Sequence, residues 1–137
     1  MFYVIDPSFA GAVIIPDEKN SSAEKMYKSI KNEDQKYVPH LFYYEMTNIF
    51  MNLIRRKRNT YEETIQLITV LSSINIIIDS ETGIEYSKKL LYLCNTYNLS
   101  SYDAAYLELA ERKRAVLCTC DESLRAAAKK HGVPVLK

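Results

Sequence analysis

The sequence predicts a three-layer α/β/α sandwich around a central, mainly parallel sheet of about four or five short strands. Short apolar, β-rich runs alternate along the chain with longer amphipathic segments that have helical periodicity. Strands that are joined by helical crossovers run parallel, and the crossover helices cover both faces of the sheet. With 137 residues, 47% of them hydrophobic, residues 1–137 are expected to form a single domain.

Five apolar runs are candidate strands, each bounded by residues that favour turns or helix caps. In chain order they are Phe2–Ile5, Tyr37–Val38, Asn75–Ile78, Ala115–Thr119 and Val133–Leu136. The third run is predicted to be buried, because its three consecutive isoleucines leave it without a polar face.

Capping residues and apolar periodicity predict the helices between these strands. The expected ranges are 8–15, 23–32, 41–56, 60–72, 80–97, 101–113 and 122–130. The candidate N-caps are Ser8, Ser21 or Ser22, Ser100 or Ser101, and Thr60, which forms a capping box with Glu63. In the helix 80–97, the residues expected to face the core are Ile84, Leu90 or Leu91, and Cys94.

Charge, cysteine content and the lengths of the apolar runs limit what kind of protein this can be. The formal net charge is +1, so any binding to nucleic acid has to come from a local basic patch. The three cysteines, Cys94, Cys118 and Cys120, contain no C-x-x-C pair and are expected to be reduced in a cytoplasmic protein. No signal peptide is visible, and the longest apolar run is too short to cross a membrane.

Four acidic residues are predicted to meet at one edge of the sheet. Asp6 follows the first strand and Asp121 follows the strand 115–119, so both lie at the carboxyl ends of parallel strands, where open α/β sheets bind ligands. Asp103 opens the helix that leads into the second of these strands, and Glu45 lies in the first turns of its own helix. Three other acids, Asp17, Asp34 and Asp79, are interpreted as loop residues.

Four carboxylates in one pocket would repel one another strongly, and a divalent cation relieves that repulsion. A set of oxygen ligands without His or Cys suits Mg²⁺ or Mn²⁺, and such ions activate water for attack on a phosphodiester. Each acid also has a structural interpretation. Asp103 could complement a helix dipole, Asp6 could form an Asx turn, Asp121 could be an N-cap, and Glu45 could lie on a solvated face.

The helix that carries Glu45 has a polar line down one side. Asn48, Asn52 and the pair Arg55 and Arg56 follow Glu45 at steps of three and four. The line ends in the basic run 55–58, which could contact nucleic-acid phosphates or could be a solvated helix end. The candidate residues for stacking on bases are Tyr43, Tyr44 and Tyr102.

Four segments together resemble the PIN domain family, and most closely its VapC toxins. They are Val4–Ser8, the helix around Glu45 and Asn48, Ser101–Tyr106, and Thr119–Leu124. The resemblance covers essentially the whole chain. It implies a metal-dependent endoribonuclease with a parallel sheet, in which Asp6, Glu45, Asp103 and Asp121 are the acids of the metal site, Thr119 supplies a hydroxyl, and Ser8 lies nearby.

The resemblance also implies a homodimer and a small antitoxin whose C-terminal tail blocks the cleft. Two positions depart from the family pattern: Pro7 replaces a small polar residue, and Cys120 stands where Ala is common. Neither departure removes a carboxylate.

Three other functions compete with the nuclease. A phospho-acceptor receiver domain needs adjacent acids after the first strand, where this chain has Asp6–Pro7. A haloacid-dehalogenase-like site needs a second aspartate two residues after Asp6, where this chain has Ser8. A catalytically silent PIN-like module that binds RNA or protein is compatible with the sequence.

Overall fold

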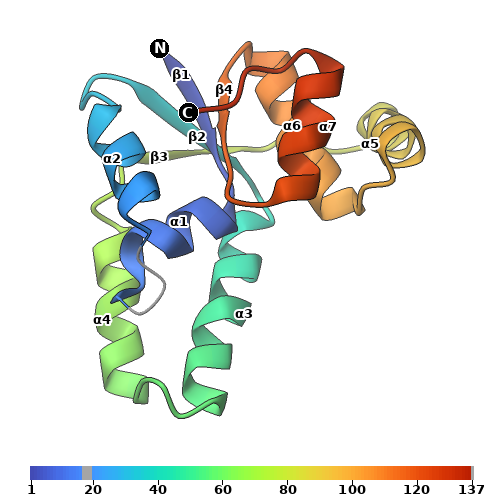
Figure 1. Ribbon diagram of the computed structural model, residues 1–137. Coiled ribbons are helices and arrows are strands. Elements are labelled where there is room, and N and C mark those ends of the chain that lie inside the picture. The colour runs from blue at the N-terminus through green and yellow to red at the C-terminus, as the bar shows by residue number, and fades with distance from the viewer. Residues whose placement is uncertain (17–19, 137) are drawn as a thin grey trace.

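A parallel sheet of four strands forms the centre of the computed structural model, which describes residues 1–16 and 20–136 (Figure 1). The strand order is β3-β2-β1-β4, and every neighbouring pair is parallel. The strands are β1 (Phe2–Ile5), β2 (Gln35–Pro39), β3 (Ile76–Asp79) and β4 (Val116–Cys118). The predicted fifth strand is reduced to a single parallel bridge between Val135 and Leu117.

Helices cover both faces of this sheet, which confirms the predicted three-layer α/β/α architecture (Figure 1). Their bounds are α1 (Pro7–Ile14), α2 (Ser21–Ser29), α3 (Phe42–Arg55), α4 (Tyr61–Leu71), α5 (Ile84–Tyr97), α6 (Ser101–Lys113) and α7 (Glu122–His131). Helix α1 packs on α2, α3 and α4, whereas α6 packs on the sheet and on α5 and α7. Within the described residues, no helix is long and apolar enough to span a membrane.

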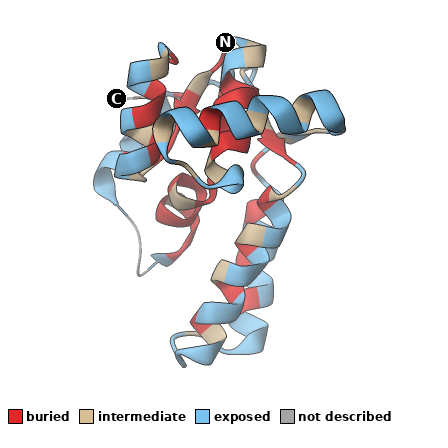
Figure 2. Ribbon diagram, turned by 90° about the vertical axis from the view of Figure 1, so that its right-hand side faces the viewer, coloured by how far each residue is buried: buried red, intermediate tan, exposed pale blue. Residues whose placement is uncertain are grey.

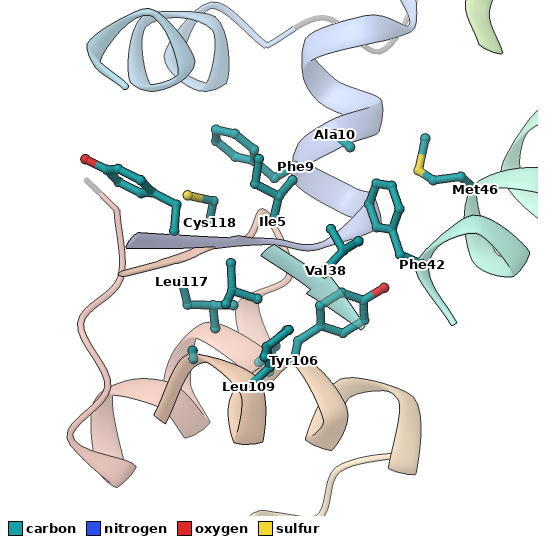
Figure 3. Close-up of a cluster of buried hydrophobic side chains, with 14 of the residues drawn as sticks. Ile5, Phe9, Ala10, Val38, Phe42, Met46, Tyr106, Leu109, Leu117 and Cys118 are labelled. Carbon is teal, nitrogen blue, oxygen red and sulfur yellow. The ribbon is translucent and has the colours of Figure 1, made fainter. Parts of the chain in front are cut away.

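The hydrophobic core lies on both sides of β1. Figure 3 shows Phe9 of α1 above Ile5 on one face of the sheet, and Tyr106 and Leu109 of α6 with Leu117 on the other. All five of these side chains are at most 1% exposed. Burial on both faces explains why β1 and β4 appear in the sequence as continuous apolar runs rather than alternating ones.

Two helix starts differ from the prediction. The N-cap of α1 is Asp6, not Ser8, because Pro7 fits the first helical position, where no backbone N–H is needed. The N-cap of α2 is Asn20, whose side chain accepts hydrogen bonds from the next turn, so the helix begins two residues earlier than expected. The predicted caps Thr60 and Ser100 are confirmed.

The third strand and the helix after it were also predicted wrongly in part. The strand β3 is an edge strand, and Ile77 and Ile78 are 40% and 48% exposed. Helix α5 begins at Ile84 because Gly83 has a φ of 106°, outside the helical region. Most of α5 is exposed (Figure 2), and its buried residue is Leu93. Of the residues expected to face the core, Leu90 and Cys94 are partly buried against it, as predicted. Ile84 and Leu91 are exposed.

Helices α3 and α4 form an arm that projects from the sheet (Figure 1). One side of the arm is apolar and continues the core, through the buried residues Phe42, Met46, Phe50 and Leu53 of α3 and Leu67 and Leu71 of α4. The start of α3 therefore lies at the carboxyl edge of the sheet, directly after β2, while its end lies at the far end of the arm.

Candidate functional site

The site begins with Asp6, the residue that follows β1. Ile5 pairs with Cys118 in the β1–β4 register, so the next residues, Asp6 and Thr119, are neighbours at the carboxyl edge. The carboxylate of Asp6 is 3% exposed and accepts hydrogen bonds on both oxygens. The Thr119 hydroxyl donates to Oδ2 at 2.5 Å, and the Ser8 hydroxyl and the Phe9 N–H donate to Oδ1 at 2.7 and 2.9 Å.

The two hydroxyls also hold the loop between β4 and α7. Thr119 Oγ1 accepts a hydrogen bond from the N–H of Asp121 at 3.0 Å, and Ser8 Oγ accepts one from the N–H of Cys120 at 2.9 Å. The two hydroxyl oxygens are 3.3 Å apart. Ser8 and Thr119 therefore connect Asp6 with the backbone that presents Asp121.

Asp121 is the N-cap of α7. Its Oδ1 accepts hydrogen bonds from the Leu124 N–H at 2.7 Å and from the Ser123 hydroxyl at 2.8 Å. The bond from Leu124 is the main reason why the pKa of Asp121 lies below its ordinary value. The interpretation of Asp121 as an N-cap is thus correct. Both of these hydrogen bonds are accepted by Oδ1.

Asp103 lies in the first turn of α6, whose N-cap Ser100 accepts the Asp103 N–H at 3.1 Å. The alanines Ala104 and Ala105 that follow are fully buried, and their small side chains let the helix pack closely on the sheet. Burial, followed by the negative charge of Asp121, raises the pKa of Asp103.

Glu45 is half-buried in the first turn of α3, and Tyr106 of α6 reaches across to it. The Tyr106 hydroxyl donates a hydrogen bond to Glu45 Oε1 at 2.7 Å. Burial raises the pKa of Glu45, while the hydrogen bond from Tyr106 lowers it by a smaller amount. The negative charges of Asp103 and Asp6 raise the pKa further.

Mutual repulsion connects the four acids electrostatically. Burial raises the pKa of Asp6, and the charge of Asp103 adds to the effect. The charge of Asp103 also raises the pKa of Glu45, and the charge of Asp121 raises the pKa of Asp103. The structure therefore brings all four predicted acids, which come from four different elements, to one edge of the sheet.

The donor set at this edge suits a hard divalent cation, because it consists of carboxylate oxygens whose mutual repulsion a cation would reduce. In the described part of the chain, however, no three His, Cys, Asp or Glu side chains are grouped closely enough to hold one ion by themselves. The arrangement fits an ion that is contacted by one or two carboxylates and that retains water in its other positions, as Mg²⁺ commonly does.

The other predicted site residues lie on the surface of α3. Asn48 is exposed one turn after Glu45, and Arg55 and Arg56 are exposed at the end of the helix. At 1.5 Å per residue, these arginines lie about 15 Å along the helix axis from Glu45. They do not belong to the acidic cluster. Tyr44 and Tyr102, which precede Glu45 and Asp103 in sequence, are 78% and 60% exposed.

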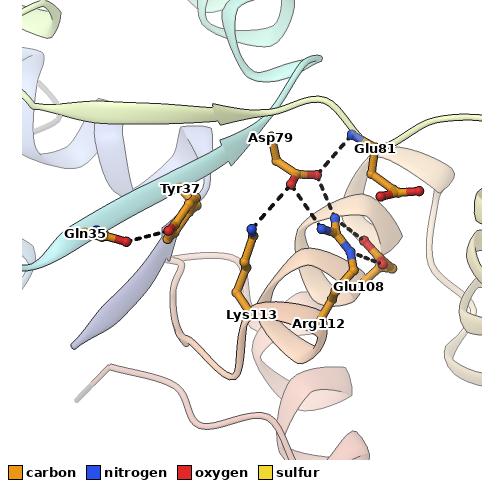
Figure 4. Close-up of polar contacts among 7 residues, drawn as sticks. All are labelled: Gln35, Tyr37, Asp79, Glu81, Glu108, Arg112 and Lys113. Carbon is orange, nitrogen blue, oxygen red and sulfur yellow. Dashed lines mark hydrogen bonds and ion pairs between the residues drawn. The ribbon is translucent and has the colours of Figure 1, made fainter.

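Asp79 has a different environment from the one predicted. It is the last residue of β3, and Arg112 of α6 binds both of its oxygens, at 3.0 and 2.6 Å (Figure 4). Arg112 Nε also donates to Glu108 at 2.8 Å. Asp79 is thus neutralised by an arginine, whereas no ion pair within residues 1–16 and 20–136 involves the four acids of the site. Asp34 accepts hydrogen bonds in the turn before β2, and Asp17 lies outside the described residues.

Sequence reasoning did not identify Tyr106 as part of the site. The signal was present, because Tyr106 comes three residues after Asp103 and therefore shares its face of α6. A buried tyrosine hydroxyl needs a hydrogen-bond partner. The partner of Tyr106 is Glu45, which lies on α3 and is 61 residues away in sequence.

The chain is similar to several known proteins. Ribonuclease VapC3 of Pyrobaculum aerophilum is 26% identical over 124 residues, which are 90% of this chain and 92% of that protein. The crystal structure of PAE2754 from the same organism has a TM-score of 0.69 and 26% identity, and covers 93% of this chain and 79% of that one. A toxin–antitoxin complex from Klebsiella pneumoniae has a TM-score of 0.59 and 16% identity, and covers 87% of this chain and 86% of that one.

The family model of the PIN domain matches residues 3–130, nearly the whole length of the chain. This match agrees with the parallel sheet of four strands and with the acids at its carboxyl edge. The chain belongs to the PIN domain family.

Proposed function

We propose that this protein is an endoribonuclease that depends on Mg²⁺ or Mn²⁺ and acts as the toxin of a toxin–antitoxin pair. The observation that carries the proposal is the convergence of Asp6, Glu45, Asp103 and Asp121, whose charges act on one another at the ligand-binding edge of the sheet. The similarity to a protein named Ribonuclease VapC3 supports RNA as the substrate.

In this proposal Asp6 and Asp103 hold the ion, directly or through water, and Glu45 and Asp121 complete the site. The bound ion would polarise a phosphoryl oxygen and provide activated water for in-line attack on a phosphodiester. Asp6 is suited to its role because three hydrogen bonds fix its orientation. Ser8 and Thr119 donate two of these bonds and are therefore positioning residues.

The surface around the acids supports RNA binding. The exposed rings of Tyr44 and Tyr102 each lie next to an acid in sequence and could stack on the bases that flank the cut. Asn48 offers an amide one turn along α3 from Glu45, and Arg55 and Arg56 offer charge for phosphates about 15 Å away. An RNA that contacts both ends of α3 spans several nucleotides.

A small antitoxin is the proposed protein partner, and a homodimer is the proposed assembly, in the cytoplasm. The similarity to the toxin–antitoxin complex from Klebsiella pneumoniae supports the antitoxin. The cheapest observation bearing on it is the gene neighbourhood, where we expect a short reading frame just upstream that encodes the partner.

Cleavage of a panel of RNAs, with and without Mg²⁺, tests the proposal. We expect the wild-type protein to cleave RNA when the metal is present, and Asp6→Asn and Asp103→Asn to be inactive but folded. Glu85→Gln is the matched control, because Glu85 is an exposed acid outside the cluster. Undiminished cleavage by both Asn variants would contradict the assignment, and a wild-type protein that binds RNA without cleaving it would indicate a catalytically silent PIN-like module.

A further inference from the structure

Tyr106 connects the two helices that carry Glu45 and Asp103. It lies on α6, it is 1% exposed, and its hydroxyl donates to Glu45 on α3. Figure 3 shows Tyr106 extending from α6 toward Phe42 at the start of α3. Apart from this hydrogen bond, the ring is surrounded by the apolar core.

We propose that Tyr106 is a positioning residue for metal binding, which holds the Glu45 carboxylate toward Asp6 and Asp103 and leaves Oε2 for the ion or its water. The inference rests on the proposed function, since it assigns a role to Tyr106 within that site. A glutamate has three rotatable side-chain bonds, and a half-buried glutamate at the start of a helix can point to solvent unless something retains it. Within the described residues, the bond from Tyr106 is the one side-chain hydrogen bond that Glu45 makes.

The surroundings of the hydroxyl support this role. The hydroxyl is part of a buried side chain and lies 2.7 Å from Glu45 Oε1. Tyr106 also comes three residues after Asp103 on α6 and therefore shares its face of that helix. A tyrosine that merely satisfied its own buried hydroxyl could use a backbone carbonyl, whereas this one contacts a carboxylate from another helix.

Tyr106 holds the side chain of Glu45 in place, whereas other groups hold Asp6 and Asp121. Asp6 is fixed by Ser8, Thr119 and the backbone, and Asp121 is fixed as an N-cap. Loss of the tyrosine hydroxyl should therefore free Glu45 while leaving those two acids in place. Partners of this kind, which hydrogen-bond a metal ligand, typically contribute roughly 10- to 100-fold to metal affinity or activity.

Mn²⁺ binding without RNA tests the inference, because electron paramagnetic resonance of free Mn²⁺ gives an affinity that does not depend on cleavage. The variants are Tyr106→Phe, which removes one hydroxyl and retains the ring, and Tyr97→Phe as the matched control. Tyr97 also hydrogen-bonds a side chain, His131 at 2.8 Å, but it lies on α5, and its partner lies on α7. Asp6→Asn completes the set as the variant expected to lose the ion.

We expect Tyr106→Phe to bind Mn²⁺ roughly 10-fold or more weakly than the wild type. We also expect a lower kcat for RNA cleavage with an unchanged KM, and Tyr97→Phe should match the wild type in both measurements. In a Glu45→Ala background, Tyr106→Phe should cause no further loss of Mn²⁺ affinity, because the tyrosine acts through Glu45. Melting temperatures of all variants separate a loss of folding from a loss of positioning.

Wild-type Mn²⁺ affinity and kcat in Tyr106→Phe, together with lost binding in Asp6→Asn, would overturn this inference and leave the proposed function intact. A further loss in the Glu45→Ala background would also overturn it, because Tyr106 would then act by another route. A wild-type protein that binds no Mn²⁺ would remove both the proposed function and the role of Tyr106.

Discussion

At the scale of single residues, Asp6 illustrates how the site is held. A carboxylate with 3% exposure is costly to bury, and burial raises its pKa. Hydrogen bonds from Ser8, Phe9 and Thr119 oppose that cost and fix both oxygens. The bond from the Phe9 N–H makes Asp6 the N-cap of α1, so one residue begins a helix and presents a charge at the edge of the sheet.

Thr119→Val should show how much the hydrogen bond from Thr119 to Asp6 contributes to stability and how much to cleavage. The substitution replaces the hydroxyl that donates to Asp6 Oδ2 with a methyl group. We expect a loss of about 1.5–3 kcal/mol in the free energy of unfolding, the range for hydrogen bonds to charged groups. Cleavage should fall by roughly 10- to 100-fold. Denaturant unfolding and single-turnover cleavage measure the two effects.

Thr64→Val is the control for this substitution. Thr64 is also a buried threonine, and its hydroxyl donates to the Thr60 carbonyl in α4, away from the acids. The Thr64→Val variant should lose about 0.5–1.5 kcal/mol in the free energy of unfolding and should cleave RNA at the wild-type rate. Equal cleavage by the two valine variants would show that Thr119 does not position Asp6.

The sequence predicted the residues of the site that follow a simple rule of position. Asp6 and Asp121 follow parallel strands, and the carboxyl edge of such a sheet collects them. The sequence showed that Tyr106 shares a helix face with Asp103, but not that its partner is Glu45, which is 61 residues away and lies on another helix. It also could not show that Asp79 would pair with Arg112, since this pair depends on how α6 crosses β3.

At the scale of elements, α3 has a different function proposed for each of its ends. Its first turn presents Glu45 to the other acids, and its last turn carries exposed basic residues about 15 Å away. Basic residues at a helix C-terminus also interact favourably with the helix dipole, so their presence alone does not establish a contact with RNA.

The double variant Arg55→Gln/Arg56→Gln distinguishes these roles. If the arginines contact phosphates, KM should rise with little change in kcat, and the dependence of log affinity on log salt should flatten by about one unit per contact. The control Lys129→Gln/Lys130→Gln removes two exposed charges from the last turn of α7. An equal effect of the two double variants would indicate general electrostatics rather than a contact at the end of α3.

The contact between β3 and α6 predicts how stability depends on pH. Hydrogen bonds from Arg112 lower the pKa of Asp79 below its value in the unfolded chain, which is about 3.9. The carboxylate therefore stabilises the fold fully above that value, and the contribution disappears as pH falls through the lower, folded-state pKa.

Urea unfolding of wild type and Asp79→Asn between pH 2 and 7 measures this contribution. The wild type should be more stable above about pH 4, and the difference should shrink as the pH falls below that value. The comparison of two proteins cancels the acids that titrate in the same range in both. A difference that stays constant down to pH 2 would show that the ion pair with Arg112 does not stabilise the fold.

Elements at the edges were the hardest to predict from sequence. The strand β3 looks like a buried strand because it contains three isoleucines, yet it pairs with β2 alone and stays partly exposed. Periodicity identified the inward face of helix α5 through Leu90 and Cys94, which pack against the core. It missed Leu93, the buried residue of that helix, and it wrongly included Ile84, which is exposed. The central strand β1 lacks this ambiguity, and its predicted range, Phe2–Ile5, is the observed one.

At the scale of the whole molecule, the α3–α4 arm is expected to belong to the same folding unit as the sheet. The buried face of α3 joins the core through Phe42 and Met46 (Figure 3) and through Phe50, so the arm is not an independent hairpin. The single domain over residues 1–137 that the length and the alternation of elements predict stays a prediction, which this continuity makes testable.

Phe50→Ala tests that continuity, because Phe50 is 3% exposed and lies well along α3. We expect the whole protein to lose about 3–5 kcal/mol of unfolding free energy, the usual cost of a Phe→Ala change in a core. Far-UV and near-UV circular dichroism should report one shared transition. Two separate transitions would indicate that the arm unfolds independently.

The central claim is that Asp6, Glu45, Asp103 and Asp121 form a divalent-metal site at the carboxyl edge of the sheet. The most direct measurement is the anomalous scattering of manganese in crystals soaked with Mn²⁺. We expect a peak beside the Asp6 and Asp103 carboxylates, absent in Asp103→Asn. A saturating soak that gives no peak among the four acids, or a peak that Asp103→Asn leaves unchanged, would contradict the claim.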